Sequence, residues 1–369
     1  MGDSKLRFGI ISYSNLRHAA GVENWIAEVV ERLSNHSWTI VTSDSGSKFS
    51  SQVYDRVTRS GARVIEIPLL PPYGFPSPST LHRFAEVFGG ADAVYFYYMG
   101  LGLRLSSLLF AELSSTPLIA GHHNWVDYGR ARWSERFGLK RFNAHHALNR
   151  EHEEQLKSLG APNVYRIGNG VHCAQFRPAD KGDLFSVLFV GRLDRGKGVD
   201  LLPAIVSSLR SEIGSQFVFH VVGGGRTKEA EEAKRLIGGC GRVVWHGYVS
   251  EDEKRELYAS SHVLVAPSRM EAFHLVGLEA MASGTPVVAS DIPGPREYVR
   301  DGYNGYLVRD VKEMAERVCE VYTAWRRGDP SYYELCRNAR RTAEEYDWDR
   351  VVPRLERMFR EVARGATSK

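Results

Sequence analysis

Short apolar runs alternate along the whole chain with longer segments in which apolar residues recur every three or four positions. Runs rich in β-branched and aromatic side chains are typical of strands, whereas the longer spacing is typical of amphipathic helices. In the first half, strands are expected at residues 6–12, 38–42, 63–67, 93–97, 118–120 and 164–167, with helices at 22–33 and 81–88. In the second half, strands are expected at residues 186–190, 217–222, 243–246, 263–266, 286–290 and 305–308.

Strands that alternate with helices form right-handed βαβ units and a parallel sheet with both faces buried. A polar stretch at residues 176–183 interrupts the pattern, which then starts again. We therefore predict an α/β protein with two Rossmann-like parallel-sheet domains, residues 1–178 and 179–346, facing each other across a cleft where ligands bind. A last helix, expected from residue 348 to 362, is predicted to pack back on the first domain as part of a segment 347–369.

The composition is that of a globular protein, with 43% hydrophobic and 25% charged residues. No apolar stretch approaches the roughly 18 residues of a spanning helix, and no signal-peptide pattern precedes the first strand. Four scattered cysteines without a CxxC pair favour reduced thiols and a cytoplasmic location. The net charge of +4 falls within residues 1–179, which indicates an anionic partner there. Nucleic acid is not expected, because no dense basic stripe with stacking aromatics is present.

The strongest chemical signal follows the strand expected at residues 263–266. Glu271 lies in a loop, and Glu279 lies eight positions on, in a helix expected to begin near Leu275, so both carboxylates can face one cleft. The first-turn amides of that helix can bind a phosphate. We expect phosphate or substrate contacts from four consecutive residues, Phe273, His274, Leu275 and Val276. One carboxylate can accept from sugar hydroxyls and the other from ribose hydroxyls. The alternative is that both glutamates are solvated surface residues.

A second signal is the glycine-punctuated turn after the strand at residues 186–190, which carries Arg192 and Lys197. Basic side chains on a strand-to-helix turn suit a diphosphate. The turn is not a P-loop, because the GxxxxGK[ST] spacing is absent. The three glycines at 223–225 do not complete a GxGxxG fingerprint either. The alternative is an ordinary exposed loop.

The combination resembles the retaining GT-B glycosyltransferases of family 4. Glu271 and Glu279 match that family's E-x7-E signature, and Arg192 and Lys197 match its "GRLxxxKG" turn. Further matches are Glu297 with Gly302–Gly305, the His246-Gly-Tyr248-Val segment, the linker around Ile167-Gly-Asn-Gly and Phe176-Arg-Pro, and Trp348. The resemblance covers most of the chain, densely from residue 187 to 308 and thinly before residue 160.

The resemblance implies a GT-B fold and a nucleoside diphosphate sugar held mainly by the C-terminal domain. It further implies transfer to a carbohydrate or lipid-linked acceptor with retention of anomeric configuration, without a metal or other cofactor. Arg192, Lys197 and the amides near Phe273–Val276 would stabilise the diphosphate, Glu271 would contact the sugar, and Glu279 the ribose. Tyr248 would lie at the nucleotide base.

In the first domain, the resemblance places Gly21, in Ala20-Gly-Val-Glu23, at the substrate. A histidine followed by Asp or Asn is common after one strand of this family, so His123, which precedes Asn124, is the expected catalytic residue and His122 the alternative. A histidine at a strand end is as often structural as functional. The basic, aromatic segment 129–142 reads either as a patch for an anionic membrane or lipid phosphate, at the inner membrane face, or as a surface helix with its aromatics packed inward.

Two positions depart from the family pattern, and the first of them bears on the donor sugar. His274 stands where a glycine commonly approaches the sugar, so it can narrow the donor pocket or add a hydrogen bond. His172 replaces the usual linker aspartate. Rival readings are a GT-B-like phosphorylase, a sugar-nucleotide epimerase, or a non-catalytic sugar-nucleotide-binding protein. The sequence leaves the donor sugar, the base, the acceptor, the pathway and the oligomeric state open.

Overall fold

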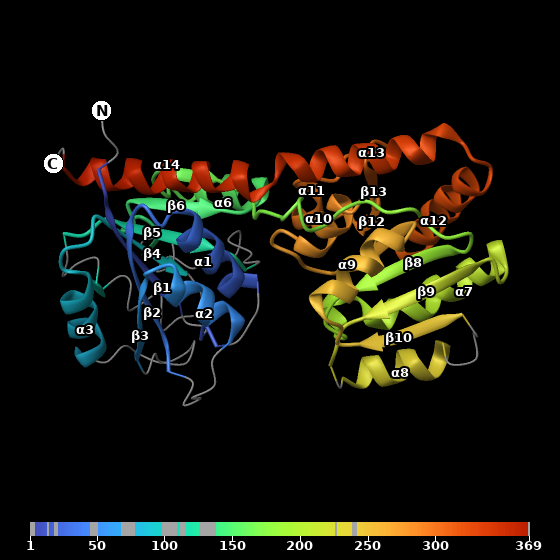
Figure 1. The fold of residues 1–369 in the computed structure, drawn as a ribbon, viewed down its shortest axis with the longest axis horizontal. Coiled ribbons are helices and arrows are strands. Elements are labelled where there is room, and N and C mark those ends of the chain that lie inside the picture. Colours follow the sequence, from blue (N-terminus) through green and yellow to red (C-terminus); the bar gives the residue numbers. More distant parts are fainter. Residues whose placement is uncertain are drawn as a thin grey trace. The chain divides into compact units, whose positions relative to one another are not determined.

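The computed structural model describes residues 4–12, 15–17, 21–44, 51–67, 78–97, 109–110, 115–124, 138–225, 227–237 and 242–367. The chain forms two compact units (Figure 1), one made of Met1–Asn169 with Asp349–Lys369 and the other of Gly170–Trp348. The two units are taken in turn.

The N-terminal unit is built on a seven-stranded sheet in the order β3-β2-β1-β4-β5-β6-β7, with every pair parallel. Its strands are β1 (Arg7–Ser12), β2 (Ser37–Ser43), β3 (Arg63–Ile67), β4 (Ala93–Tyr97), β5 (Leu118–His122), β6 (Ala144–Ala147) and β7 (Val164–Arg166). All residues of β4, β5 and β6 are buried, as expected for central parallel strands covered on both faces. The helices of this unit are α1 (Gly21–Arg32), α2 (Gln52–Arg59), α3 (Pro78–Phe88), α6 (Arg150–Ser158) and, from Asp349 onward, α14 (Trp348–Thr367).

The C-terminal helix α14 packs on the sheet of this first unit. Val351, Leu355 and Phe359 recur every three or four positions and are buried, which is the pattern of a helix with one apolar face. The Phe359 ring lies 5.0 Å from that of Phe8 and 5.3 Å from that of Trp38, measured between centroids. The helix therefore completes the core of the N-terminal unit although it is last in the sequence.

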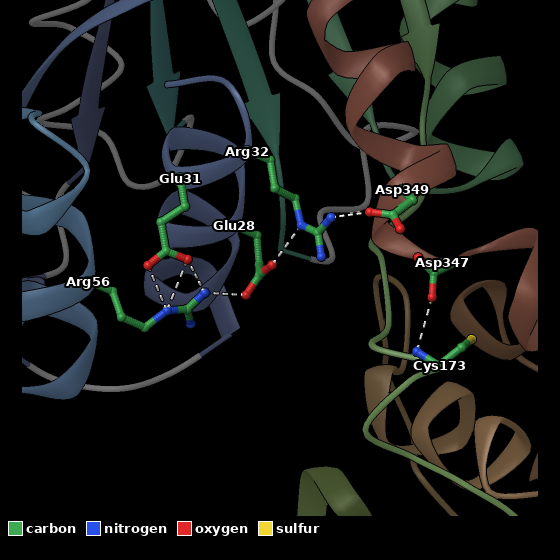
Figure 2. A network of polar contacts seen from close by, with 7 residues as sticks. All are labelled: Glu28, Glu31, Arg32, Arg56, Cys173, Asp347 and Asp349. Atoms are coloured by element: carbon green, nitrogen blue, oxygen red, sulfur yellow. Dashed lines mark hydrogen bonds and ion pairs between the residues drawn. The ribbon is translucent and has the colours of Figure 1, made fainter. Parts of the chain in front are cut away.

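Polar contacts add to this packing (Figure 2). The Arg56 guanidinium on α2 lies between the carboxylates of Glu28 and Glu31 on α1, and Arg32 joins Glu28 to Asp349 at the start of α14. Glu28 is buried, so its two arginine partners offset the cost of removing its charge from water.

The C-terminal unit is built on a six-stranded parallel sheet in the order β10-β9-β8-β11-β12-β13. Its strands are β8 (Phe185–Val190), β9 (Phe217–Val222), β10 (Val243–Gly247), β11 (Val263–Ala266), β12 (Val287–Ser290) and β13 (Gly305–Val308). Its helices are η2 (Arg195–Lys197), η3 (Val199–Leu201), α7 (Leu202–Ile213), α8 (Lys228–Ile237), α9 (Glu251–Ser260), α10 (Leu275–Ala282), α11 (Pro293–Arg296), α12 (Val311–Arg326) and α13 (Pro330–Glu345). Side chains of β8, β9, β11, α7 and α12 form one apolar core.

The structure confirms the predicted fold class, with two Rossmann-like parallel-sheet units, and each predicted strand lies within two residues of an observed one. Strand β6 has no counterpart among the predictions, because Ala-His-His-Ala carries none of the β-branched or large apolar side chains that indicate a strand. The first unit ends at Asn169 rather than at residue 178. The next residues pack within the second unit, since Val171 bonds to the backbone of Tyr346, and Lys181 donates to Thr285 at 2.9 Å.

Among the described helices, none is long and apolar enough to cross a membrane. Of the basic, aromatic segment, residues 129–137 lie outside the described residues. Leu139 and Phe142, which follow, are buried in the core of the N-terminal unit, while Lys140 and Arg141 are exposed.

Candidate functional site

The sheet of the C-terminal unit has a switch point between β8 and β11. The chain continues from β8 to β9 on one side and from β11 to β12 on the other, so the connections leave in opposite directions. In open α/β sheets, ligands bind outside the carboxyl ends of the strands at such a point. The loops that follow these two strands, residues 191–198 and 267–274, are the two segments that the sequence singled out for phosphate and sugar binding.

Backbone contacts hold the two loops together. Gly198 has φ of 76°, and a Cβ there would lie 2.1 Å from the carbonyl oxygen of Pro267, so a glycine is required. The Arg269 amide donates to the Gly196 carbonyl at 2.9 Å, and its guanidinium binds both carboxylate oxygens of Asp200 at 2.7 and 2.9 Å. The side chains that project from the loops are therefore held on a fixed framework.

Lys197 and Glu271 meet at this point. The Lys197 Nζ lies 2.5 Å from Oε1 of Glu271, and Ser268 donates to the same oxygen at 2.9 Å. The two side chains are 23% and 11% exposed, so the pair is largely shielded from water. Burial opposes ionisation of Glu271, but His274, Lys197 and Ser268 together hold the pKa of its carboxyl below the usual range. A cation and a carboxylate thus lie side by side at the switch point.

His274 occupies an unusual position between this pair and helix α10. Its φ is 70°, a left-handed conformation that costs a residue with a Cβ roughly 1–2 kcal/mol. The Tyr298 hydroxyl donates to the His274 carbonyl at 2.7 Å and lies 2.9 Å from Nδ1 of its ring. A Cβ on Gly277 would lie 2.6 Å from that ring, so only glycine leaves room for it. Burial lowers the pKa of His274 to about 4, and the ring is therefore uncharged at neutral pH.

Helix α10 begins at Leu275, as the sequence predicts, and its N-cap residue His274 makes no side-chain capping bond. The first-turn amides of a helix have no partner within the helix, and those of Leu275 and Val276 are in this position here. An anion at such a helix terminus is favoured by the amides and by the helix dipole. Phe273 itself is buried against Tyr298 and Tyr346. Its side chain is therefore a core residue, and only its backbone can face a ligand.

Glu279 is held by helix α9. The Tyr258 hydroxyl donates to its Oε2 at 2.8 Å, and Lys254 Nζ lies 3.6 Å from the same oxygen. Burial raises the pKa of the Glu279 carboxyl, while Lys254 and Tyr258 oppose that rise. Both of these contacts fall on Oε2, so Oε1 can accept from a ligand hydroxyl.

Tyr248 and the three glycines form the other side of the β8 turn. Tyr248 is 86% exposed, and a Cβ on Gly224 would lie 2.0 Å from its ring. Gly223, with φ of 133°, would place a Cβ 1.8 Å from the Gly191 carbonyl oxygen. The glycines therefore allow β9 and the β8 turn to approach each other. Their run of three directly after a strand is the signal that could have identified this role in the sequence.

Arg192 and Gly21 contribute less to the arrangement. The Arg192 side chain is 77% exposed and pairs with Asp194 at 3.1 Å, so the structure does not bring it to the Lys197–Glu271 pair. Gly21 begins α1 of the N-terminal unit, and residues 18–20 before it lie outside the described residues. Sequence reasoning missed four residues that hold the predicted site residues in place: Ser268, Tyr298, Lys254 and Tyr258.

In the N-terminal unit, His123 directly follows β5 and is buried. Its ring packs edge-on against that of Trp25, with centroids 4.8 Å apart, and its Nε2 lies 2.7 Å from the Tyr95 hydroxyl. Burial lowers the pKa of His123 well below its usual value. Within the part of the chain that the structure describes, no group of three or more His, Cys, Asp or Glu side chains could hold a metal ion.

Two Rossmann-like units, one of which has a cation, a carboxylate and a helix N-terminus at its switch point, are typical of α/β proteins that bind ligands at the carboxyl ends of their strands. Comparison with known families specifies the class. The Glycosyltransferase Family 4 model matches residues 19–175, and the Glycosyl transferases group 1 model matches residues 185–324. The chain belongs to the GT-B glycosyltransferases of family 4, the group 1 glycosyl transferases.

Curated relatives agree with this membership. An uncharacterized glycosyltransferase of Methanocaldococcus jannaschii is 32% identical over 47% of this chain and 44% of its own length. The GDP-mannose-dependent alpha-mannosyltransferase of Corynebacterium glutamicum is 25% identical over 97% of this chain and 89% of its own length. The chain spans about half the length of the first curated relatives it matches.

Solved structures share the fold. A glycosyltransferase from Rickettsia africae superposes with a TM-score of 0.82 at 17% identity, covering 98% of this chain and 99% of the other. HepE of Anabaena, solved in complex with UDP and glucose, superposes with a TM-score of 0.76 at 16% identity, covering 96% and 100%.

Proposed function

We propose that the protein transfers a sugar from a nucleoside diphosphate sugar to a carbohydrate or lipid-linked acceptor, with retention of anomeric configuration and without a metal ion. The C-terminal unit binds the donor, and His123 of the N-terminal unit contacts the substrate. The names of the mannosyltransferase relative and of the UDP complex are consistent with such a donor. Family membership supports retention.

The contact between Lys197 and Glu271 carries the proposal. A nucleoside diphosphate sugar joins an anionic phosphate to a neutral, hydroxyl-rich ring through one oxygen. A site for that junction needs a cation and a hydrogen-bond acceptor a few ångströms apart, and the two side chains meet this requirement at 2.5 Å. The Glu271 side chain is 11% exposed and the Lys197 side chain 23%, so the pair is more buried than an ordinary surface ion pair. It also lies at a switch point beside a helix N-terminus that has no side-chain cap.

In the proposed reaction, an acceptor hydroxyl attacks the anomeric carbon while the bond from that carbon to the phosphate oxygen breaks. The hydroxyl proton passes to the leaving phosphate on the same face of the sugar. Negative charge grows on the diphosphate, where Lys197 and the amides of Leu275 and Val276 stabilise it. Arg192 adds to this stabilisation by turning its exposed side chain from Asp194 to a phosphate oxygen.

The two glutamates have different tasks in this proposal. Glu271 binds hydroxyls of the donor sugar, because it adjoins the phosphate-binding lysine. Glu279 lies about one turn into α10 and binds the ribose hydroxyls through Oε1. Tyr248, exposed beside the β8 turn, lies at the base.

A transfer assay tests the proposal. Wild-type protein in EDTA is incubated with UDP-, GDP- and ADP-sugars and a panel of simple glycosides and polyprenyl phosphates, and the anomeric proton coupling of each product is read by NMR. A product with the anomeric configuration of its donor is expected. The sugar-transfer proposal fails if inorganic phosphate is required as the acceptor or if the free donor is isomerised. Inverted product, or activity that returns only with Mg²⁺ or Mn²⁺, contradicts retention or metal independence respectively.

A further inference from the structure

His123 is the first member of a buried hydrogen-bonded chain in the N-terminal unit. Its Nε2 lies 2.7 Å from the Tyr95 hydroxyl, which lies 2.7 Å from Nδ1 of His146. The Nε2 of His146 lies 2.7 Å from the carbonyl oxygen of Ile167. Tyr95 and His146 are 1% and 0% exposed, so water cannot replace any of these contacts.

The direction of each bond follows from counting protons. A carbonyl only accepts, so His146 must carry its proton on Nε2 and donate it to Ile167. Burial lowers the pKa of His146 to about 4, so its Nδ1 is an unprotonated acceptor at neutral pH and takes the one proton of Tyr95. The Tyr95 oxygen can then only accept from His123, which must carry its proton on Nε2.

This assignment leaves Nδ1 of His123 with a lone pair and, among the described residues, no hydrogen-bond partner. The ring is uncharged, because burial and His146 keep its pKa well below the usual value. Trp25 and Tyr97 pack on the imidazole with centroids 4.8 and 5.6 Å away, which fixes its plane. The nitrogen available for a ligand is therefore an acceptor and not a donor.

We infer that Tyr95 and His146 are positioning residues that hold His123 in the Nε2–H tautomer, so that Nδ1 accepts a hydrogen bond from a hydroxyl of the bound carbohydrate. The inference rests on the proposed function for the identity of the ligand. The tautomer itself depends only on the contacts within this unit.

A second histidine chain lies next to the first and provides a matched control. His122 Nε2 lies 3.0 Å from Nδ1 of His145, whose Nε2 lies 2.9 Å from the Leu139 carbonyl oxygen. Successive residues along β5 and β6 point to opposite faces of the sheet. His122 and His145 therefore lie on one face, and His123 and His146 on the other. His145 is as buried as His146 but does not touch Tyr95 or His123 through any hydrogen bond that the described residues show.

The test is Tyr95→Phe in the full chain, with nitrogen-15-labelled histidine. Long-range proton–nitrogen NMR spectra report the tautomer of each ring, and a His123→Gln spectrum assigns the His123 signal. Wild type is expected to show Nε2–H at His123. In Tyr95→Phe the signal is expected to become a mixture of tautomers, and kcat to fall about tenfold with little change in the donor's KM, the scale of one hydrogen bond. In the control, His145→Gln, the His123 tautomer is expected to remain and kcat to stay within about twofold.

The outcomes separate the two claims. A His123 ring that carries its proton on Nδ1 in wild type overturns the assignment, whatever the activity. A tautomer change in Tyr95→Phe with unchanged kcat overturns the positioning role. If the tautomer behaves as expected but no sugar transfer is found with any donor, the proposed function fails while the tautomer assignment stands. Thermal unfolding curves show whether the control variant His145→Gln is folded. If it is not, Thr42→Val, a substitution at another buried position, on β2, serves as the control.

Discussion

Replacing Lys197 with Met removes the cation beside Glu271 and keeps most of the side-chain volume. At an effective dielectric constant of about 20, two unit charges at the observed 2.5 Å attract each other by roughly 7 kcal/mol, most of which the desolvation of both groups offsets. Loss of one partner of a buried pair costs about 3–5 kcal/mol. Because Lys197 is 23% exposed, we expect a smaller cost than this range, about 2–3 kcal/mol.

The loss should depend on pH in a defined direction. The folded-state pKa of Glu271 lies below its usual 4.5, so the pair contributes stability above that pH and loses it as the pH falls through the folded-state value. Lys197→Met should therefore be less stable than wild type at pH 7, and the two should converge as Glu271 becomes protonated in the wild type. Adding Glu271→Gln to Lys197→Met should recover much of the loss, because it removes the unpaired buried charge.

The assay is urea unfolding at pH 7 and at lower pH, followed by hydrogen exchange of amides in β8 and β11, which reports on the C-terminal unit alone. Arg195→Met is the matched control, since Arg195 is exposed on the same turn, and it should change stability by less than about 0.5 kcal/mol. A similarly small loss in Lys197→Met, or no recovery in the double variant, would refute the reasoning.

Glu279→Gln should weaken binding of a bare nucleoside diphosphate by about 1–3 kcal/mol in calorimetry, whereas Glu271→Gln should leave that affinity nearly unchanged and lower turnover strongly; equal effects on bare-nucleotide binding contradict the division of roles. His274→Gly should be more stable than His274→Ala by about 1 kcal/mol in denaturant unfolding, because alanine is strained at the positive φ of this position and glycine is not. Equal stabilities of the two variants would show that the conformation is not strained. Arg192→Ala should lower kcat/KM by an amount equal to about 2–4 kcal/mol of lost transition-state stabilisation. A fall of less than about threefold would show that Arg192 is not part of the diphosphate site.

Much of the fold was predictable because both sheets are parallel and buried on both faces. Such strands are continuous apolar runs bounded by polar turns, so their limits are visible locally. Strand β6 was not visible, because its histidines are compatible with a buried strand only when Tyr95 and the Leu139 and Ile167 carbonyls satisfy their nitrogens. Those partners come from distant parts of the chain.

The candidate site, too, combines features that are visible in the local sequence with contacts between distant residues that are not. The basic turn and the E-x7-E spacing could be read locally, whereas the contact between Lys197 and Glu271 joins residues 74 positions apart and exists because β8 and β11 are neighbours. The pairing of Arg192 with Asp194 was not expected from the resemblance. The left-handed conformation of His274 was not visible either, because a residue with a Cβ gives no sequence signal for positive φ.

Calorimetric titration of UDP, GDP and ADP into wild-type protein, Lys197→Ala and Arg195→Ala tests most directly whether the switch point between β8 and β11 is a nucleoside diphosphate site. We expect one of the nucleotides to bind the wild type and Arg195→Ala with equal affinity, and to bind Lys197→Ala about 10- to 100-fold more weakly, the loss of one charge-assisted contact. Equal affinity for Lys197→Ala and the wild type would place the nucleotide elsewhere and contradict the account.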